Sequence, residues 1–181
     1  MTKTNAVGLI AVLLTLFVSF STAQERSLAK LGPGERFTSA EFGVSVALPK
    51  DPTETVKTSA GTEYRWSFKE GRIAMQFGNY LTPEFEPNEN TRAGFLKGYK
   101  EGFIKMSSIK FVSESPAAMG TFRGLTYILD IPGQKLRVHD TEMTSGRRFA
   151  SIIAGGYTNV PGSEELFEKV VRSITLTAPV K

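Results

Sequence analysis

Two acidic side chains, Asp140 and Glu142, are spaced in a way that could support chemistry in this 181-residue chain. One residue separates them in an alternating segment typical of a β-strand, which would place both carboxyl groups on one face, about 7 Å apart. Such a pair could serve a carboxylate-based hydrolase or bind a cation such as calcium, although calcium needs about six or more oxygen ligands. The alternative is an exposed strand face, on which the two acids pair with Arg147 or Arg148 across a hairpin.

His139 is the only histidine of the chain, and therefore the only imidazole available for acid–base chemistry. Asp140 follows it directly, and neighbouring side chains on a strand point to opposite faces, so Asp140 cannot orient this imidazole as a catalytic triad requires. The sequence has no cysteine, no Gly-x-Ser-x-Gly motif and no glycine-rich nucleotide motif. Zinc-thiolate and multi-histidine metal sites are therefore excluded. We expect a structural His139, and we predict no catalytic residue, metal or cofactor.

The candidate binding residues are three arginines, Arg137, Arg147 and Arg148. Arginine binds carboxylate and phosphate groups through two parallel hydrogen bonds, so a cluster of these side chains would recognise an anionic ligand or partner. Because Arg147 and Arg148 are adjacent on a strand, at most one of them can point into the core-facing layer. The alternative is that all three are ordinary solvated charges. A formal net charge of +4 is mild, and with an exported location it predicts no nucleic-acid partner.

The first 23 residues have the pattern of a signal peptide. Lys3 precedes an apolar run over residues 6–20, and Ser21-Thr22-Ala23 supplies the small residues of a cleavage site. The run is about 15 residues long, whereas a membrane-spanning helix needs about 20. We therefore expect cleavage after Ala23 and export to the periplasm or the medium, with no transmembrane span in the mature chain. A retained membrane anchor is the alternative.

The remainder of the chain is expected to form one domain over residues 37–181. Residues 24–36 are polar and contain Gly32-Pro33-Gly34, which predicts a flexible lead-in. The residues predicted to be buried together in the core of the domain are Phe42, Val44, Val46, Trp66, Phe77, Phe103, Phe149, Phe167 and Val171.

Periodic apolar residues predict seven strands and two helices in this domain. The first helix is expected to begin near Asn88 or Asn90, and the second has Ser163 as its predicted N-cap. Residues 116–120 are predicted to be a connection, and Gly155-Gly156 to end the last strand. Because hairpins dominate, the fold class is α+β, a mainly antiparallel sheet of about six to seven strands flanked by two helices in an α/β/α sandwich. The strands are expected over residues 41–49, 64–68, 73–80, 109–113, 122–131, 135–143 and 147–154.

Three apolar patterns carry a resemblance to a known family. They are the first strand Phe42-Gly43-Val44-Ser45-Val46-Ala47-Leu48-Pro49, the late hairpin through Arg147-Arg148-Phe149, and the closing helix Phe167-x-x-Val170-x-x-Ser173-Ile174. With this layout the chain resembles the PsbP-like fold family over nearly all of the mature sequence. That family includes the extrinsic protein of the photosynthetic oxygen-evolving complex, a Ran-binding nuclear import factor and exported bacterial proteins of unknown role. Its members share no active site, so the resemblance implies a fold and transfers no functional residue.

These observations favour an exported, non-enzymatic binding or accessory module that recognises a protein partner or a small ligand. The alternative is a carboxylate-based hydrolase that uses Asp140 and Glu142. The two hypotheses differ in geometry. An enzyme needs both acids in a concave pocket with raised pKa values, whereas a binding module needs an exposed, partly apolar or basic surface.

Overall fold

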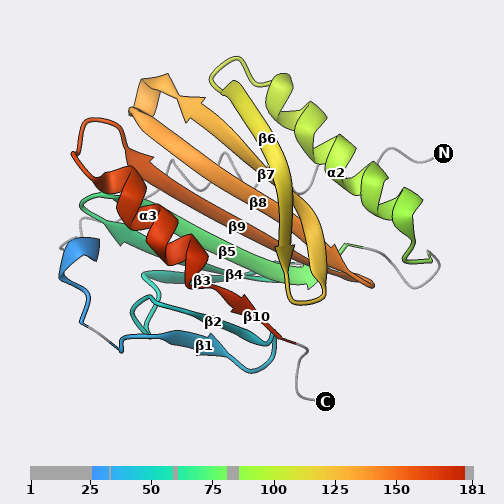
Figure 1. Cartoon of the computed structure of the whole chain (residues 1–181), viewed down its shortest axis with the longest axis horizontal. Coiled ribbons are helices and arrows are strands. Elements are labelled where there is room, and N and C mark those ends of the chain that lie inside the picture. Colours follow the sequence, from blue (N-terminus) through green and yellow to red (C-terminus); the bar gives the residue numbers. More distant parts are fainter. Residues whose placement is uncertain (1–25, 33, 59–60, 81–85, 178–181) are drawn as a thin grey trace.

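The computed structural model describes residues 26–32, 34–58, 61–80 and 86–177 of the chain (Figure 1). The predicted signal peptide and its cleavage site lie outside the described residues, so both stay predictions. Within the described ranges, no helix is both long enough and apolar enough to cross a membrane.

A seven-stranded antiparallel sheet forms the centre of the fold, in the order β3-β4-β5-β9-β8-β7-β6. Strands that follow one another in the chain pair as hairpins, except β5 and β6, which are separated by the first long helix. The strands are β3 (Glu54–Thr58), β4 (Gly61–Phe68), β5 (Gly71–Asn79), β6 (Lys110–Met119), β7 (Phe122–Ile131), β8 (Leu136–Ser145) and β9 (Arg148–Tyr157).

A second, three-stranded sheet joins the two ends of the described chain. It consists of β1 (Phe37–Ser39), β2 (Val44–Val46) and β10 (Thr175–Leu176), with β2 in the middle. Sequence patterns predicted β2, because the alternation around it continues from Phe42 to Leu48 beyond the strand itself. They did not predict β1, β3 or β10, which have two to five residues. The 3-10 turns η1 (Leu28–Lys30) and η2 (Pro132–Gln134) complete the elements.

The two helices cover opposite faces of the large sheet. Helix α2 (Glu89–Ile104) begins after Asn88, whose side chain accepts hydrogen bonds from the backbone of Asn90 and Thr91 and forms a capping box. Helix α3 (Ser163–Arg172) lies in front of β9 and β5 in Figure 1, whereas α2 lies at the β6 end of the sheet. The predicted α+β class with a helix on each side is therefore confirmed.

The apolar core is divided by the sheet into two clusters, whereas the sequence predicted one. The first cluster joins α3 to the small sheet, and its largest members include Trp66, Phe77 and Phe167. The second lies under α2 and includes Phe103 and Tyr127. Alternate residues of each strand point to opposite faces, so a sheet covered on both sides has two separate apolar layers. Of the residues predicted to be buried, only Val171 is half-buried.

Two strand ends differ from the prediction. Strand β6 continues through Pro116 to Met119, because β6 is an edge strand in which proline need not donate to a ladder on both sides. Strand β9 continues through Gly155 and Gly156, which allow close packing rather than ending the strand. A Cβ atom on Gly156 would lie 3.3 Å from the ring of Phe167. The N-cap of α3 is Gly162 rather than Ser163, whose hydroxyl donates to the carbonyl of Tyr157.

Part of the expected flexible lead-in is packed against the large sheet. Arg26 forms a bridge with Phe68, and the side chain of Leu28 is buried in the first cluster. The Ser27 hydroxyl and the Leu28 amide both donate to the carboxylate of Glu70. Burial alone would raise the pKa of Glu70, but these hydrogen bonds outweigh burial and lower it. The segment is therefore held by one carboxylate that accepts two donors.

Candidate functional site

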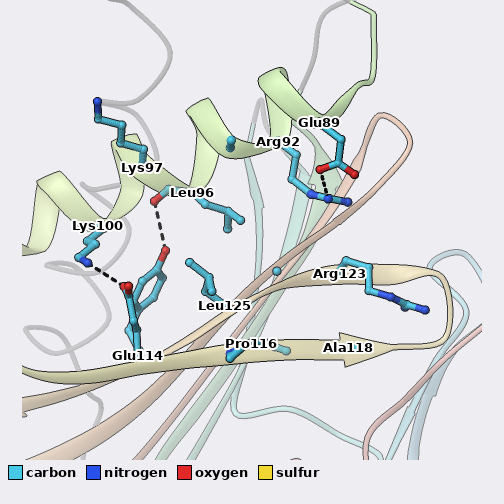
Figure 2. Close-up of a pocket in the computed structure, with 14 residues that line it drawn as sticks. Glu89, Arg92, Leu96, Lys97, Lys100, Glu114, Pro116, Ala118, Arg123 and Leu125 are labelled. Carbon is cyan, nitrogen blue, oxygen red and sulfur yellow. Dashed lines mark hydrogen bonds and ion pairs between the residues drawn. The ribbon is translucent and has the colours of Figure 1, made fainter.

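An open groove of about 650 Å³ lies between α2 and the β6–β7 hairpin (Figure 2). Its apolar surface comes from both walls, and Figure 2 shows Leu96 of α2 and Leu125 of β7 pointing toward each other across it. A volume of this size falls within the usual range of ligand-binding clefts. The lining residues are Glu89, Arg92, Ala93, Leu96, Lys97, Lys100, Glu114, Pro116, Ala117, Ala118, Arg123, Gly124, Leu125 and Tyr127.

Two polar contacts fix α2 to the sheet at the inner end of this groove. The Tyr127 hydroxyl donates to the carbonyl of Leu96 over 3.1 Å. The Lys100 ammonium lies 2.8 Å from the Glu114 carboxylate and 5.1 Å from the centre of the Phe111 ring. The Tyr127 hydroxyl and the Lys100–Glu114 ion pair therefore fix the distance between α2 and strands β6 and β7.

The groove carries more positive than negative charge. Four cationic side chains and two acidic ones line it, and each acid is already paired, Glu89 with Arg92 and Glu114 with Lys100. Arg123 makes hydrogen bonds of 2.5 and 2.8 Å to the carbonyls of Gly120 and Phe122. Among the described residues, no carboxylate lies within ion-pair distance of Arg123. The exposed Arg123 guanidinium is thus available to an anionic group next to an apolar surface.

Asp140 and Glu142 lie on one face of β8, as predicted, but that face is buried under α2. Both residues are 0% exposed, and neither lines the groove. The alternative of an exposed strand face with arginine partners is therefore wrong. Substrate has no path to these carboxyl groups, and the hydrolase hypothesis has no support from the site. Within the described chain, no three potential metal-ligating side chains lie together.

The electrostatics of this acid pair follow from burial. Burial raises the pKa of Asp140 above its usual range. Burial, followed by the neighbouring charge of Asp140, raises the pKa of Glu142 well above its usual range. The phenol of Tyr99 donates to Asp140 Oδ2 over 3.4 Å, whereas Asp140 Oδ1 and both oxygens of Glu142 have no hydrogen-bond partner. The pair is therefore stable as neutral acids and costly as anions.

The three predicted binding arginines do not form one cluster. Arg137 lies near the start of β8, where it pairs with Asp130 at 2.9 Å and lies 3.8 Å from Glu164. Arg147 and Arg148 are at the turn that joins β8 to β9, about 26 Å away along the strand.

Arg148 is turned toward the protein rather than toward solvent. Its guanidinium donates to the carbonyl of Phe42 over 2.9 Å and lies 5.5 Å from the centre of the Phe122 ring. Burial lowers the pKa of this guanidinium. Arg147 is half-buried in the turn, and its carbonyl accepts a hydrogen bond from the Tyr80 amide. The expectation that at most one of the two points into a packed layer agrees with these positions.

His139 is on the opposite face of β8 from Asp140, under α3. Its Nε2 atom lies 3.5 Å from the Glu164 carboxylate, and the side chain is 18% exposed. Asp140 does not contact the imidazole, as the alternation of the strand requires. His139 contacts α3 through Glu164, and its structural role stays a prediction.

The sequence pattern did not single out the groove. Residues 116–120 were predicted to be a connection, so the hairpin that forms one wall was not recognised as a continuous surface. Only the position of α2 above β6 and β7 shows that Lys97 and Lys100 border an apolar surface.

Comparisons with known proteins identify the fold but not a function. No protein-family model and no curated protein sequence matches the chain. The solution structure of cyanobacterial PsbP (CyanoP) from Synechocystis sp. PCC 6803 matches with a TM-score of 0.50 and 9% identity. The match covers 89% of this chain and 99% of that chain.

A second similar structure comes from Bacteroides thetaiotaomicron VPI-5482, with a TM-score of 0.42 and 13% identity over 80% of this chain and 49% of that chain. At these identities a structural likeness defines the fold alone. The match to CyanoP covers both chains almost fully, and it agrees with the resemblance carried by the first strand, the late hairpin and the closing helix. The chain has a PsbP-like α+β fold.

Proposed function

We propose that this protein is an exported, non-enzymatic accessory module that binds an acidic segment of a partner protein in the groove between α2 and the β6–β7 hairpin. Export rests on the signal-peptide pattern of the first 23 residues. The PsbP-like fold is compatible with an accessory or binding module and does not by itself identify a partner.

The observation that carries the proposal is that Arg123, which lines the groove beside an apolar surface, has no carboxylate partner among the described residues. Arg123 is exposed, the register of β6 and β7 places it beside Ala118, and Leu125 and Pro116 line the same groove. An acidic side chain would pair with Arg123, while an adjacent apolar side chain would enter the space between Leu96 and Leu125. The net positive lining complements a negatively charged segment and would repel a basic one.

A peptide segment suits this groove better than an enclosed small molecule. The groove is open, and one of its walls is β6, the edge strand of the seven-stranded sheet. An edge strand can be approached by an extended chain without displacing any element of the fold. Arg92 and Lys100 already have acidic partners, so they would contribute long-range attraction rather than a direct first contact.

The arginines predicted from the sequence have a different place in this proposal. Arg147 stays a candidate for a second contact with an anionic partner, at the turn between β8 and β9. Arg137 and Arg148 already have partners within the fold, Asp130 for the former and the carbonyl of Phe42 for the latter. We therefore rank Arg123 above all three as the residue that pairs with the partner.

The proposal is tested by nuclear magnetic resonance titration of the purified protein with a synthetic peptide of alternating glutamate and leucine. The matched control peptide has lysine in place of glutamate. We expect amide shifts confined to residues 92–100 and 116–125 with the acidic peptide, and none with the basic one. Arg123→Glu is expected to lower the affinity for the acidic peptide by about tenfold or more.

Lys57→Glu is the matched control variant, because Lys57 is an exposed cation on β3, at the far edge of the sheet. It makes the same change in net charge as Arg123→Glu. Equal weakening by both variants would show that binding depends on net charge alone and would overturn the proposal. Shifts located outside the groove, or no shifts at all, would also overturn it.

A further inference from the structure

Two carboxyl groups are enclosed between α2 and the sheet, and no cation of the described residues forms an ion pair with either of them. Asp140 and Glu142 are 0% exposed, and of their four oxygens only Asp140 Oδ2 has a hydrogen-bond partner, the phenol of Tyr99. Both residues are two positions apart on β8, so their side chains share one face. An anion at this position would be buried, close to a second acid and almost unpaired.

Among the described residues, the groups around the pair come from α2, β7 and β9 and supply no positive charge. Tyr99 faces it from α2, Tyr127 from β7 and Ser151 from β9. Glu114 of β6 adds a further negative charge that acts on Tyr127, and Lys100 is engaged with Glu114 by an ion pair. Cross-strand register also places Leu125 beside Glu142 and Ile153 beside Asp140. Deprotonation would therefore be relieved by water rather than by a protein cation.

Helix α2 is the layer that water would displace most easily. The strands on either side of β8 are held by hydrogen-bonded ladders. Helix α2 is held by side-chain packing and by a few single contacts, including Tyr127 to the Leu96 carbonyl and Lys100 to Glu114. Its buried residues are only Leu96, Tyr99, Gly102 and Phe103. Three interior glycines, at positions 94, 98 and 102, each weaken the helix by about 1 kcal/mol relative to alanine. Lifting α2 would hydrate the acids and leave the sheet intact.

We propose that α2 docks on the sheet only while the Asp140–Glu142 pair retains at least one proton. Protonation of this pair would then decide whether the groove between α2 and the β6–β7 hairpin is formed. The effect of this protonation on peptide binding rests on the proposed function, since peptide binding requires the docked helix. The docking of α2 itself does not depend on any ligand. Rising pH ionises the pair, water enters under α2, and the groove loses Leu96 and the rest of its helical wall.

The decisive measurement is amide hydrogen exchange of residues 89–104 at pH 6.0 and pH 8.5, corrected for the intrinsic pH dependence of exchange. In the unmodified protein we expect α2 protection to fall by about tenfold or more relative to β8 and β9. In the Asp140→Asn/Glu142→Gln double variant, which mimics the neutral pair, we expect equal α2 protection at both pH values. His139→Gln is the control, because His139 is on the other face and its removal should leave the α2 response unchanged.

The same loss of α2 protection in the protein and in the double variant would overturn the inference. A pH-independent α2 in the unmodified protein would overturn it as well. Titration with the glutamate–leucine peptide separates this result from the proposed function. A peptide that binds equally at both pH values, with α2 protection unchanged, supports the groove and contradicts the proton control. A pH-dependent α2 with no peptide binding at either pH supports the proton control and contradicts the groove.

Discussion

The Tyr99 hydroxyl donates to Asp140 Oδ2 over 3.4 Å, and this contact joins α2 to a carboxyl group that solvent does not reach. The phenol itself is fully buried, and burial, followed by the charge of Asp140, raises its pKa well above the usual value. Tyr99 therefore stays protonated over the neutral pH range, and its hydroxyl remains able to donate to Asp140. It is the one donor that the pair receives within the described chain.

Tyr99→Phe is expected to destabilise the protein more at pH 8 than at pH 5. The hydroxyl stabilises the ionised form of Asp140, so its loss raises the pKa of Asp140 further and extends the range over which ionisation costs stability. We expect a loss of about 1 kcal/mol at pH 8 and less at pH 5. Urea denaturation at both pH values measures the difference. Phe167→Leu, which alters the packing of α3 on the other face of the sheet without a polar group, is the control and should cost the same at both.

Replacing the acid pair by amides is expected to remove a fall in stability with rising pH. A carboxyl group whose pKa is raised in the folded state binds protons that the unfolded state releases. Its stabilising effect is complete below the unfolded pKa, near 4, and is lost as pH rises through the folded value. The free energy of unfolding should therefore decline above pH 5 in the unmodified protein. Asp140→Asn/Glu142→Gln should flatten the decline and gain about 1–3 kcal/mol at pH 8.

Carboxyl groups with lowered pKa values affect stability at acidic pH, below the range in which the buried pair ionises. Asp130 and Glu70 have lowered pKa values, so their contribution is present above their unfolded pKa and lost on acidification. A denaturation series from pH 5 to pH 9 therefore isolates the buried pair. An equal slope in the unmodified protein and in the double variant would show that Asp140 and Glu142 do not control it.

Helix α3 packs closely on Gly71, so we expect substitutions at this contact to lower the stability of the protein. Gly71 has a φ of +153°, and a Cβ atom there would lie 2.0 Å from the carbonyl oxygen of Gly155 and 2.6 Å from the Phe167 ring. Gly71→Ala must therefore shift either the strand or α3, and we expect a loss above about 2 kcal/mol. Phe167→Ala should cost about 3–5 kcal/mol, since it opens a cavity in the first cluster.

Thermal unfolding of these two variants can be compared with Gly94→Ala. Gly94 lies on α2, and a Cβ atom there would meet no atom within 4 Å, so this substitution should raise stability by a few tenths to about 1 kcal/mol. A Gly71→Ala variant as stable as the unmodified protein would contradict the packing described for α3.

The strands and helices with long apolar patterns were predictable from the sequence. Which face of the sheet each helix covers was not. The apolar pattern identified β4, β5, β7, β8 and β9, because each has at least eight residues and most of them are buried or half-buried. The sequence also located the shared face of Asp140 and Glu142. It did not predict that α2 covers that face, because an acidic pair on a strand usually indicates solvent.

The groove was not predictable for a related reason. Its walls are 14 or more positions apart in the chain, and no local pattern specifies how far α2 stands from β6 and β7. The arginine positions show the same limit. Alternation predicted that Arg147 and Arg148 differ in orientation, but not that Arg148 would bond to the carbonyl of Phe42 in the small sheet. Such contacts depend on tertiary packing between segments that share no sequence pattern.

The two arginines at the turn between β8 and β9 should respond differently to substitution. Arg148 donates to the Phe42 carbonyl, lies over the Phe122 ring and is half-buried, so it joins the small sheet to the large one. Arg148→Met keeps most of the packing but leaves the carbonyl unpaired, and it should cost about 1–2 kcal/mol. Arg148→Glu should cost more, about 3 kcal/mol, because an unpaired acid would be half-buried there.

Arg147→Glu should change the free energy of unfolding by less than about 1 kcal/mol, because Arg147 is in the turn rather than between the two sheets. Chemical denaturation of the three variants measures these differences at one pH. The contrast matters for any test of anion recognition at this end of the sheet. Loss of partner binding in Arg147→Glu, with an unchanged denaturation midpoint, would identify a contact. The same loss in Arg148→Glu would report unfolding, because Arg148 is a structural link.

An Arg148→Met protein with an unchanged midpoint would show that the bond to Phe42 does not stabilise the fold.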